Sequence, residues 1–290
     1  MVENEAYWHA LIHKIKPDLD IKNVELYQEG LVSNILIVNH EWVIRFTNTA
    51  WGKELLDQEH QLMEYLKPRL TLSIPSSVRH SDGVLIYPYL AGETFRREFW
   101  EEVDQAGQQK LADQLGQFLK ELHHAPTTDL DWELPLTLAP VTRETWVDIY
   151  DRLVEKVQPL LLPYQIKWMT SLFEPALSID DFFDFDPVII HGDLMPLHIL
   201  YRPDVEALNS VINFGSAGLG DPATDLGSLI SAYGETLVSR LAGSYPDYES
   251  LLSRARFYAR ALELQWVLLG VESNEYYWFT SHLGGPRDIR

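Results

Sequence analysis

Three polar side chains stand where apolar stretches of the sequence end, and their types suit work on a hydroxyl group or a metal ion. Asp193 follows the apolar run of "VIIHGDLM", and Asn213 follows that of "VINFG". His198 opens the stretch "HILYRPDVEALNSVINFG", in which Pro203 and Asp204 predict the turn of a hairpin. If the hairpin is symmetric about its turn, His198 lies directly opposite Asn213, with Cβ atoms about 4.5–5.5 Å apart. We therefore expect a carboxylate, an imidazole and an amide to converge.

This trio of side chains has two chemical interpretations. A carboxylate can orient an attacking hydroxyl and accept its proton, while a hard cation such as Mg²⁺ prefers oxygen ligands and imidazole suits softer metals. The second interpretation groups His191, Asp193 and His198 as the metal cluster of a hydrolase. The spacing permits such a cluster, but it leaves Arg45, Glu59 and the segment "GDPATDL" without a role.

The elements that must position these residues fall into two parts, which predicts an α+β protein. Short runs rich in β-branched and aromatic residues, interrupted by one helix-like stretch, predict a small antiparallel sheet before residue 89. From about residue 98 the apolar spacing is mainly helical. We place the boundary in the stretch 87–92, which gives parts 1–88 and 89–290. The expected strands are 24–30, 34–39 and 41–46, and the stretch 83–92 is expected to be a short buried strand followed by a connection marked by proline and glycine. The expected helices are 4–15, 52–70, 108–126, 145–161, 163–177, 225–234 and 248–271.

Composition narrows the classes of partner. The formal net charge is −20, which argues against binding to nucleic acid or to an anionic membrane and favours cationic partners. The chain has no cysteine, so disulfides and thiolate metal sites are excluded. No apolar run reaches the roughly 20 residues that span a bilayer, and the first residues lack the features of a signal peptide. We expect a cytoplasmic protein, and the sequence predicts nothing about a protein partner.

Taken in order, "VIRF…QEHQLMEYL", "HGDLMPLHIL" and "VINFGSAGLGDPATDLG" resemble the aminoglycoside phosphotransferase family. This family comprises protein-kinase-like kinases of small molecules, and its relatives include choline, homoserine and methylthioribose kinases. The resemblance covers nearly the whole chain. It implies a two-lobe fold, with a small antiparallel-sheet N-lobe holding one helix and a larger, mainly helical C-lobe. It also implies a phosphotransferase that uses ATP or GTP with Mg²⁺, or with Mn²⁺ as an alternative ion.

The resemblance implies a role for each matched position. Asp193 matches the catalytic carboxylate, and His198 and Asn213 fall at the two metal-binding positions. Arg45 takes the place of the phosphate-clamping lysine, with Glu59 as its ion-pair partner. The other implied positions are Gly30 and Ser33 in the loop over the phosphates, Tyr89 and Leu90 in the purine-reading hinge, and Asp221 and Asp225 in the segment that orders the loop behind the site.

Each of these roles has a structural alternative. Asp193 and Asn213 also suit turns, His198 also suits a hydrogen-bonded structural position, and Arg45 with Glu59 also suits an exposed ion pair. From the residues alone, we interpret Asp225 as the N-cap of the helix that follows it.

Asn213 departs from the family pattern, which has a metal-binding aspartate there, and His198 stands where the kinase motif has asparagine. Both metal positions are therefore uncharged when the imidazole is neutral. We estimate that the lost charge costs roughly 1–3 kcal/mol, or about 10- to 100-fold in metal binding or rate. The alternative function is therefore a pseudokinase, which binds a nucleotide or another ligand and turns it over weakly.

The acceptor is expected to be a small molecule with a hydroxyl group. The acidic balance favours a cationic acceptor, such as an aminoglycoside or an amino alcohol. The acidic run 178–186 is either part of its pocket or an exposed, solvated loop. The candidate acceptor-binding residues are Asp181, Asp184, Glu272, Glu275, Tyr276 and Trp278.

Overall fold

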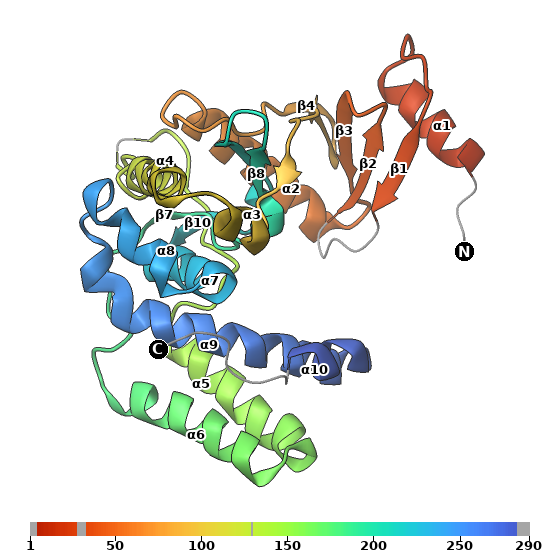
Figure 1. Ribbon diagram of the computed structural model, residues 1–290. Helices are drawn as coiled ribbons and strands as arrows, with labels where there is room; N and C mark the ends of the chain where they lie inside the picture. Colours follow the sequence, from red (N-terminus) through yellow and green to blue (C-terminus); the bar gives the residue numbers. More distant parts are fainter. Residues whose placement is uncertain (1–4, 28–32, 129, 283–290) are drawn as a thin grey trace.

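An antiparallel sheet of five strands forms the N-terminal part of the molecule (Figure 1). The computed structural model describes residues 5–27, 33–128 and 130–282, and its strands follow the order β1–β2–β3–β5–β4. The three consecutive strands and the later one predicted from the sequence are confirmed, and β4 is an addition to them. The strands are β1 (Val24–Tyr27), β2 (Asn34–Val38), β3 (Trp42–Phe46), β4 (Val78–Ser81) and β5 (Val84–Pro88).

Two helices accompany this sheet. Helix α1 (Glu5–Ile15) packs its apolar face, including Trp8 and Ile12, against strand residues such as Leu36 and Ile44. The predicted inserted helix is α2 (Ala50–Leu66), and the Thr49 side chain caps it by accepting a hydrogen bond from the Gly52 N–H at 3.0 Å. The buried face of α2 joins the large core that it shares with the C-terminal part. Strand β5 lies between the two cores, because Leu85 belongs to the core of α2 and Ile86 to the core of α1.

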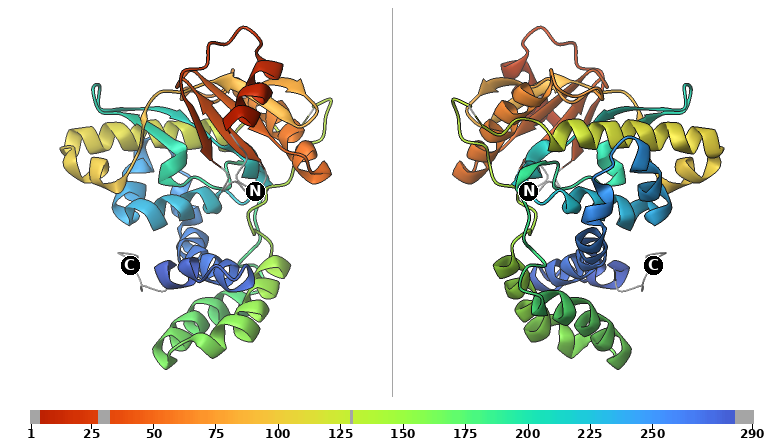
Figure 2. Two further views of the ribbon diagram at one scale, coloured as in Figure 1. Left: turned by 90° about the vertical axis from the view of Figure 1, so that its right-hand side faces the viewer. Right: turned by 90° about the vertical axis from the view of Figure 1, so that its left-hand side faces the viewer.

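The C-terminal part is mainly helical, as predicted, and α7 and α9 pack along each other at its centre. In Figure 2, α5 and α6 extend away from the N-terminal sheet on the far side of α9. No helix within the described residues is long and apolar enough to cross a membrane. The helices are α3 (Arg97–Glu102), α4 (Gln105–His123), α5 (Arg143–Arg152), α6 (Pro163–Ser178), α7 (Ala223–Tyr233), α8 (Glu235–Ser239), α9 (Tyr248–Glu272) and α10 (Tyr276–His282).

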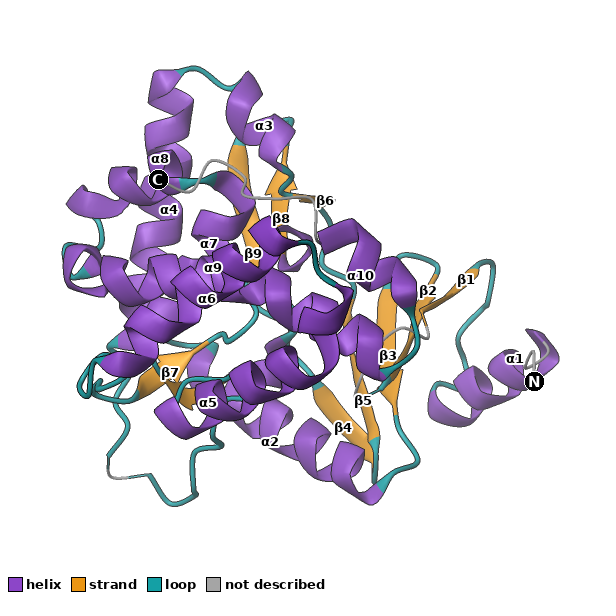
Figure 3. Ribbon diagram, turned by 90° about the horizontal axis from the view of Figure 1, so that it is seen from below, coloured by secondary structure: helices purple, strands orange, loops and turns teal. Residues whose placement is uncertain are grey.

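Two small sheets lie among these helices (Figure 3). Asp193, His198 and Asn213 lie in the segments that adjoin their strands. Strands β7 (Val188–Ile190) and β10 (Gly218–Gly220) pair in one, and β6 (Glu93–Thr94), β8 (Ile199–Arg202) and β9 (Ala207–Val211) form the other. The chain leaves the five-stranded sheet after Pro88, and β6 already pairs with β8. The chain thus changes sheets between Pro88 and Glu93, and the division into two parts at 87–92 stays a prediction.

The predicted hairpin is present, but its register differs by one residue from the symmetric arrangement. Ile212, and not Asn213, lies opposite His198, since the Ile212 N–H donates to the His198 carbonyl at 2.9 Å. The cause is the position of the turn, because Arg202 pairs with Ala207 and the turn is centred one residue earlier than the symmetric arrangement requires. A bulge that adds Asn209 to β9 then restores part of this offset. The Asn209 side chain donates to the Ala91 carbonyl at 2.7 Å, which holds the bulge against the segment that precedes β6.

Aromatic rings fasten the α5–α6 pair to α9. Phe173 of α6 is fully buried, stacks on Tyr150 with ring centroids 5.0 Å apart, and meets Phe257 of α9 edge-on at 5.4 Å. Trp146 of α5 meets the same Phe257 at 5.0 Å. These rings bury apolar surface where the helix pair joins the rest of the molecule.

We predict that Phe173→Ala lowers the free energy of unfolding by about 3–5 kcal/mol, because it removes a fully buried ring and leaves a cavity. Tyr164→Ala on the same helix is the matched control, because the Tyr164 side chain is 68% exposed. Urea denaturation followed by circular dichroism measures both variants. Equal midpoints for the two variants would contradict the prediction.

Candidate functional site

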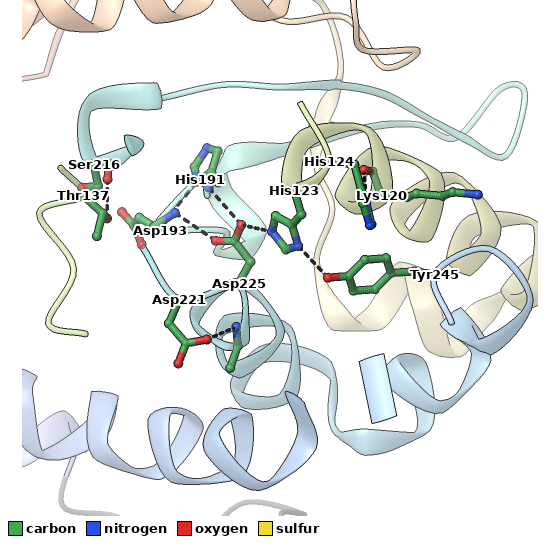
Figure 4. A network of polar contacts seen from close by, with 12 residues as sticks. Lys120, His123, His124, Thr137, His191, Asp193, Ser216, Asp221, Asp225 and Tyr245 are labelled. Carbon is green, nitrogen blue, oxygen red and sulfur yellow. Dashed lines mark hydrogen bonds and ion pairs between the residues drawn. The ribbon is translucent and has the colours of Figure 1, made fainter. Parts of the chain in front are cut away.

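A buried carboxylate holds the turn in which Asp193 lies. Asp225 is fully buried in the first turn of α7, and its oxygens accept the backbone N–H groups of His191 and Gly192, each at 2.9 Å. His123 of α4 contributes its Nε2 at 3.1 Å, and its Nδ1 contacts the Tyr245 hydroxyl at 2.8 Å (Figure 4). One side chain thereby joins α4, α7 and the end of β7.

These contacts stabilise the charged form of Asp225. Burial alone would raise the pKa of this carboxyl, but the hydrogen bond and charge of His123, the charge of His191 and the His191 N–H outweigh burial and lower the pKa below its ordinary value. The predicted role in ordering the loop agrees with this geometry. The N-cap interpretation is wrong, because α7 begins at Ala223 after Pro222 and Asp225 already lies inside the helix.

Asp221 orders the segment before α7. It is fully buried, accepts the Ala223 N–H at 2.9 Å and the Tyr258 hydroxyl at 2.8 Å, and forms an ion pair with Arg254 at 2.6 Å. The segment is therefore fixed to α9 on one side through Asp221 and to the turn after β7 on the other through Asp225.

His198 and Asn213 meet as predicted, although by a different route from direct strand pairing. The His198 Nδ1 lies 2.7 Å from the Asp193 carbonyl oxygen, which can only accept, so Nδ1 carries the proton. The Nε2 therefore accepts, and the Asn213 side-chain amide donates to it at 2.7 Å. Burial lowers the pKa of His198, although the charge of Asp193 opposes this effect. Because the pKa is lowered, the imidazole is neutral at pH 7.

This hydrogen-bonding pattern decides what His198 and Asn213 can offer to a ligand. Both ring nitrogens of His198 are engaged, so the ring presents no lone pair to a metal. The Asn213 Nδ2 is fixed on the imidazole, which leaves Oδ1 as its available ligand atom. The Asn213 backbone is left-handed, with φ 67°, a conformation that asparagine adopts more readily than most residues. The amide is thus held by its backbone and by its partner.

Arg45 and Glu59 form the predicted ion pair, and both side chains are buried, so the exposed-pair alternative is wrong. The Arg45 Nε also donates to the Ser33 Oγ at 3.1 Å. Burial would lower the pKa of Arg45, but Glu59 and Tyr87 together outweigh burial and raise this pKa, so the guanidinium stays charged. The second Glu59 oxygen, Oε2, is buried and makes no hydrogen bond within the described residues.

Arg45 and Glu59 come close to Asn213 around Gly215. A Cβ atom placed on Gly215 would lie 3.5 Å from Arg45 Nη2, 3.6 Å from Glu59 Oε2 and 3.7 Å from Asn213 Oδ1. Gly215 therefore marks the point at which a cation and two oxygens from β3, α2 and the turn after β9 approach one another. This cluster contains the cation and the amide oxygen that the sequence assigns to phosphate and metal.

Asp193 itself lies at the edge of a cavity of about 310 Å³. Its side chain is 37% exposed, and the Asp193 N–H donates to the His191 Nδ1 at 3.3 Å. The His191 Nε2 is 3.0 Å from the Ile212 carbonyl, so both nitrogens of this ring are engaged as well. Among the described residues, no three His, Asp or Glu side chains are grouped to hold a metal, and the hydrolase interpretation is therefore wrong.

The hinge and loop residues are placed in part. Gly30 lies outside the described residues, and Ser33 contacts Arg45 as given above. The Tyr89 N–H donates to the Glu41 carbonyl at 2.8 Å, so this group is not available to a purine. Leu90 follows it in the segment between the two sheets.

The candidate acceptor-binding residues do not line the cavity next to Asp193. Asp181 and Asp184 lie in the turn after α6, Glu275 accepts from the Trp278 Nε1 at 3.1 Å, and the Tyr276 side chain lies outside the described residues. Glu272 is paired with Arg152 and with Lys156 at 2.7 Å, and Arg152 foremost lowers its pKa to about 2. Trp278 stacks on Trp266, with ring centroids 5.1 Å apart, and Trp266 does line the cavity.

The sequence interpretation missed several residues that do line this cavity. They are Trp146 of α5, Thr224 of α7, and Gln265 and Trp266 of α9. Two signals could have found some of them. Thr224 lies within the segment "GDPATDL", and Leu262, Gln265, Trp266 and Leu269 have the spacing of one helix face.

Comparison with known proteins agrees with this geometry. The model of the phosphotransferase enzyme family matches residues 27–260, and the chain belongs to this family. No curated protein matches its sequence.

The solved structures that resemble the chain cover it almost entirely. The GDP complex of aminoglycoside 2′-phosphotransferase-IIIa is 24% identical over 97% of this chain and 96% of that chain, with a TM-score of 0.82. An ADP-bound aminoglycoside phosphotransferase of type (2″)-Ib is 19% identical over 97% of each chain, with a TM-score of 0.71. The macrolide 2′-phosphotransferase of Brachybacterium faecium is 19% identical over 97% of this chain and 98% of that chain, with a TM-score of 0.68. The protein-kinase-like two-lobe fold is thereby confirmed.

We predict that Asp225→Asn lowers the free energy of unfolding by about 1–3 kcal/mol at pH 7, because an amide cannot accept from every donor around this carboxylate. The folded pKa of Asp225 is below the ordinary 3.8. The stabilisation by the wild-type carboxylate is therefore complete above pH 3.8 and is lost as the pH falls through the folded pKa.

Urea denaturation at pH 7, pH 5 and below pH 4 tests this prediction. The difference between wild type and variant should be constant down to pH 5 and shrink below pH 4. Asp204→Asn, at an exposed carboxylate paired with Arg202, is the control and should show no measurable change. A difference that grew on acidification would contradict the prediction.

Proposed function

We propose that the protein transfers the γ-phosphoryl group of ATP or GTP to a hydroxyl group of a small molecule, with Asp193 as the general base. The observation that carries the proposal is the convergence of Arg45, Asn213 and Glu59 on Gly215, close to the turn that holds Asp193. The family membership and the GDP- and ADP-bound relatives support a nucleotide as the donor.

The residues divide the work of phosphoryl transfer, which needs positioning and charge neutralisation more than covalent chemistry. Arg45 is held by Glu59 and Ser33, so its guanidinium presents a fixed positive charge to the phosphates at little further entropic cost. Asp193 is accessible from the cavity, where its carboxylate orients the acceptor hydroxyl and takes its proton. The hydrogen bonds of Asp225 keep Asp193 in place while it orients the hydroxyl and while it takes the proton.

The residues at the site also fit a hard divalent cation. The Asn213 Oδ1 is fixed and free of hydrogen bonds within the described residues. Mg²⁺ is commonly bound by one or two protein ligands together with the substrate phosphates. Asn213 would hold it, and His198 would position Asn213 instead of binding the metal. The bound ion would supply neutralisation of the phosphate charge.

A second candidate function rests on the same amide. Neither Asn213 nor the neutral His198 adds negative charge, so metal binding is weaker than at a carboxylate. The chain would then bind a nucleotide without efficient turnover, as a pseudokinase does. Turnover measured in the wild type separates the two functions.

We predict that Asp193→Ala lowers kcat by about 10²–10⁴-fold, the usual contribution of a general base, and leaves the affinity for ADP within about twofold. Transfer of radiolabelled γ-phosphate from ATP and from GTP to a panel of small alcohols, with Mg²⁺ or Mn²⁺, gives the rates, and calorimetry gives the affinity. Nucleotide binding without transfer by the wild type would support the pseudokinase function and exclude the phosphotransferase function. Transfer unaffected by Asp193→Ala would remove Asp193 as the base.

We also predict that the double variant His198→Asn with Asn213→Asp binds Mg²⁺ about 10- to 100-fold more tightly in the presence of ADP than the wild type does. Asn213→Asp alone should gain less. An aspartate must accept from His198, whose Nδ1 proton is already used, so the imidazole would have to become protonated. The His198 pKa, followed by NMR, should therefore rise in the single variant. An unchanged His198 pKa in that variant would contradict the assigned hydrogen bonds.

A further inference from the structure

The cavity next to Asp193 has predominantly apolar walls. Trp266, which forms part of one wall, is backed by a stack in which Trp278 lies 5.1 Å and His282 lies 5.9 Å from it, so this wall is rigid. A cavity of about 310 Å³ accommodates one ring-sized portion of a ligand. The apolar residues along it are Leu138, Ala139, Pro140, Trp146, Met195, Tyr258, Leu262, Trp266 and Leu269.

Negative charge is scarce in the same cavity. Asp193 is the only carboxylate among its lining residues, and Gln265, Ser216 and Thr224 supply neutral polar groups. The acidic side chain of Glu272, near the end of α9, is neutralised by Arg152 and Lys156. A molecule with several ammonium groups would lose the hydration of each group while finding one partner. Burial of an unpaired charge is strongly unfavourable, so the cavity selects against such acceptors.

A buried hydroxyl without a partner among the described residues lies along the cavity. Thr224 is 6% exposed and its Oγ1 makes no hydrogen bond within the described residues. Buried polar atoms are usually satisfied, so this hydroxyl indicates a polar group that arrives with a ligand.

We propose that the acceptor is a largely apolar alcohol that carries at most one positive charge and places one oxygen against the Thr224 hydroxyl. The proposal rests on the phosphotransferase function proposed above and names the chemical class of its acceptor. The apolar face of the acceptor lies on Trp266 and Leu269. A single amine, where present, is matched by the single carboxylate Asp193. This class includes macrolides and excludes molecules with many amines, such as kanamycin. It therefore differs from the cationic acceptor expected from the net charge.

Direct binding tests the class independently of turnover. Erythromycin, a large apolar lactone with one amine, and kanamycin, which carries several, are titrated separately into the wild-type protein by calorimetry in the presence of ADP and Mg²⁺. We expect saturable binding of erythromycin and at least about tenfold weaker binding of kanamycin. Kanamycin binding as tight as that of erythromycin, or no binding of erythromycin at 1 mM, would overturn the proposal.

Variants locate the binding within this cavity. Leu269→Glu adds a charge to the apolar wall and should weaken erythromycin at least about tenfold. Ser253→Glu adds the same charge to an exposed position of the same helix and should have no effect. Thr224→Val removes one hydroxyl with little change of shape and should weaken erythromycin about 3- to 10-fold, with ADP affinity unchanged. Equal effects of the two glutamates, or none from Leu269→Glu, would overturn the assignment to this cavity.

The outcome for the acceptor class can be separated from that for the proposed function. Erythromycin binding without phosphoryl transfer to any acceptor would remove the phosphotransferase function and keep the specificity of the cavity. Phosphoryl transfer to kanamycin and not to erythromycin would keep the function and overturn the acceptor class.

Discussion

The position of the candidate base depends on one buried carboxylate. Asp225 accepts two consecutive backbone N–H groups immediately before Asp193, and such a pair of donors can be served by one carboxylate only when the chain turns sharply. Gly192 provides that turn with φ 78°, and a Cβ atom there would lie 2.6 Å from both the Ser216 carbonyl and the Thr137 Oγ1. His123 holds the other side of the carboxylate. The network therefore sets where Asp193 points before any ligand binds.

His198 and Asn213 form a second constraint, and they work as a matched pair. The Asp193 carbonyl determines which nitrogen of His198 is protonated, that nitrogen determines the orientation of the Asn213 amide, and the amide determines which atom faces Gly215. A change of either residue alone disturbs the other. The uncharged pair thus holds an amide oxygen in a fixed position, but it attracts a metal ion less strongly than a carboxylate would.

Local patterns in the sequence predicted most of the elements, because apolar periodicity and turn residues act over a few positions. The ordered motifs predicted which side chains come together. The hairpin register was beyond this information, since it depends on where the turn is centred and on the bulge at Asn209. This bulge is held by a carbonyl of Ala91, more than a hundred residues earlier in the chain. The cavity residues were missed for the same reason. Trp146, Thr224 and Trp266 come from three helices, and only their packing places them around Asp193.

The net charge of the chain and the charge inside a particular cavity act on different parts of a ligand. The formal charge of −20 belongs to the whole chain, and at physiological ionic strength each exposed charge is screened within about 8 Å. What a buried portion of a ligand experiences is set by the side chains that touch it, and in this cavity those include one carboxylate. Glu272 shows the difference, because its nearest neighbours are Arg152 and Lys156, which cancel its charge locally. The acidic surface thus favours the approach of a cationic molecule, whereas the proposed acceptor class follows from the apolar lining of the cavity that presents Asp193.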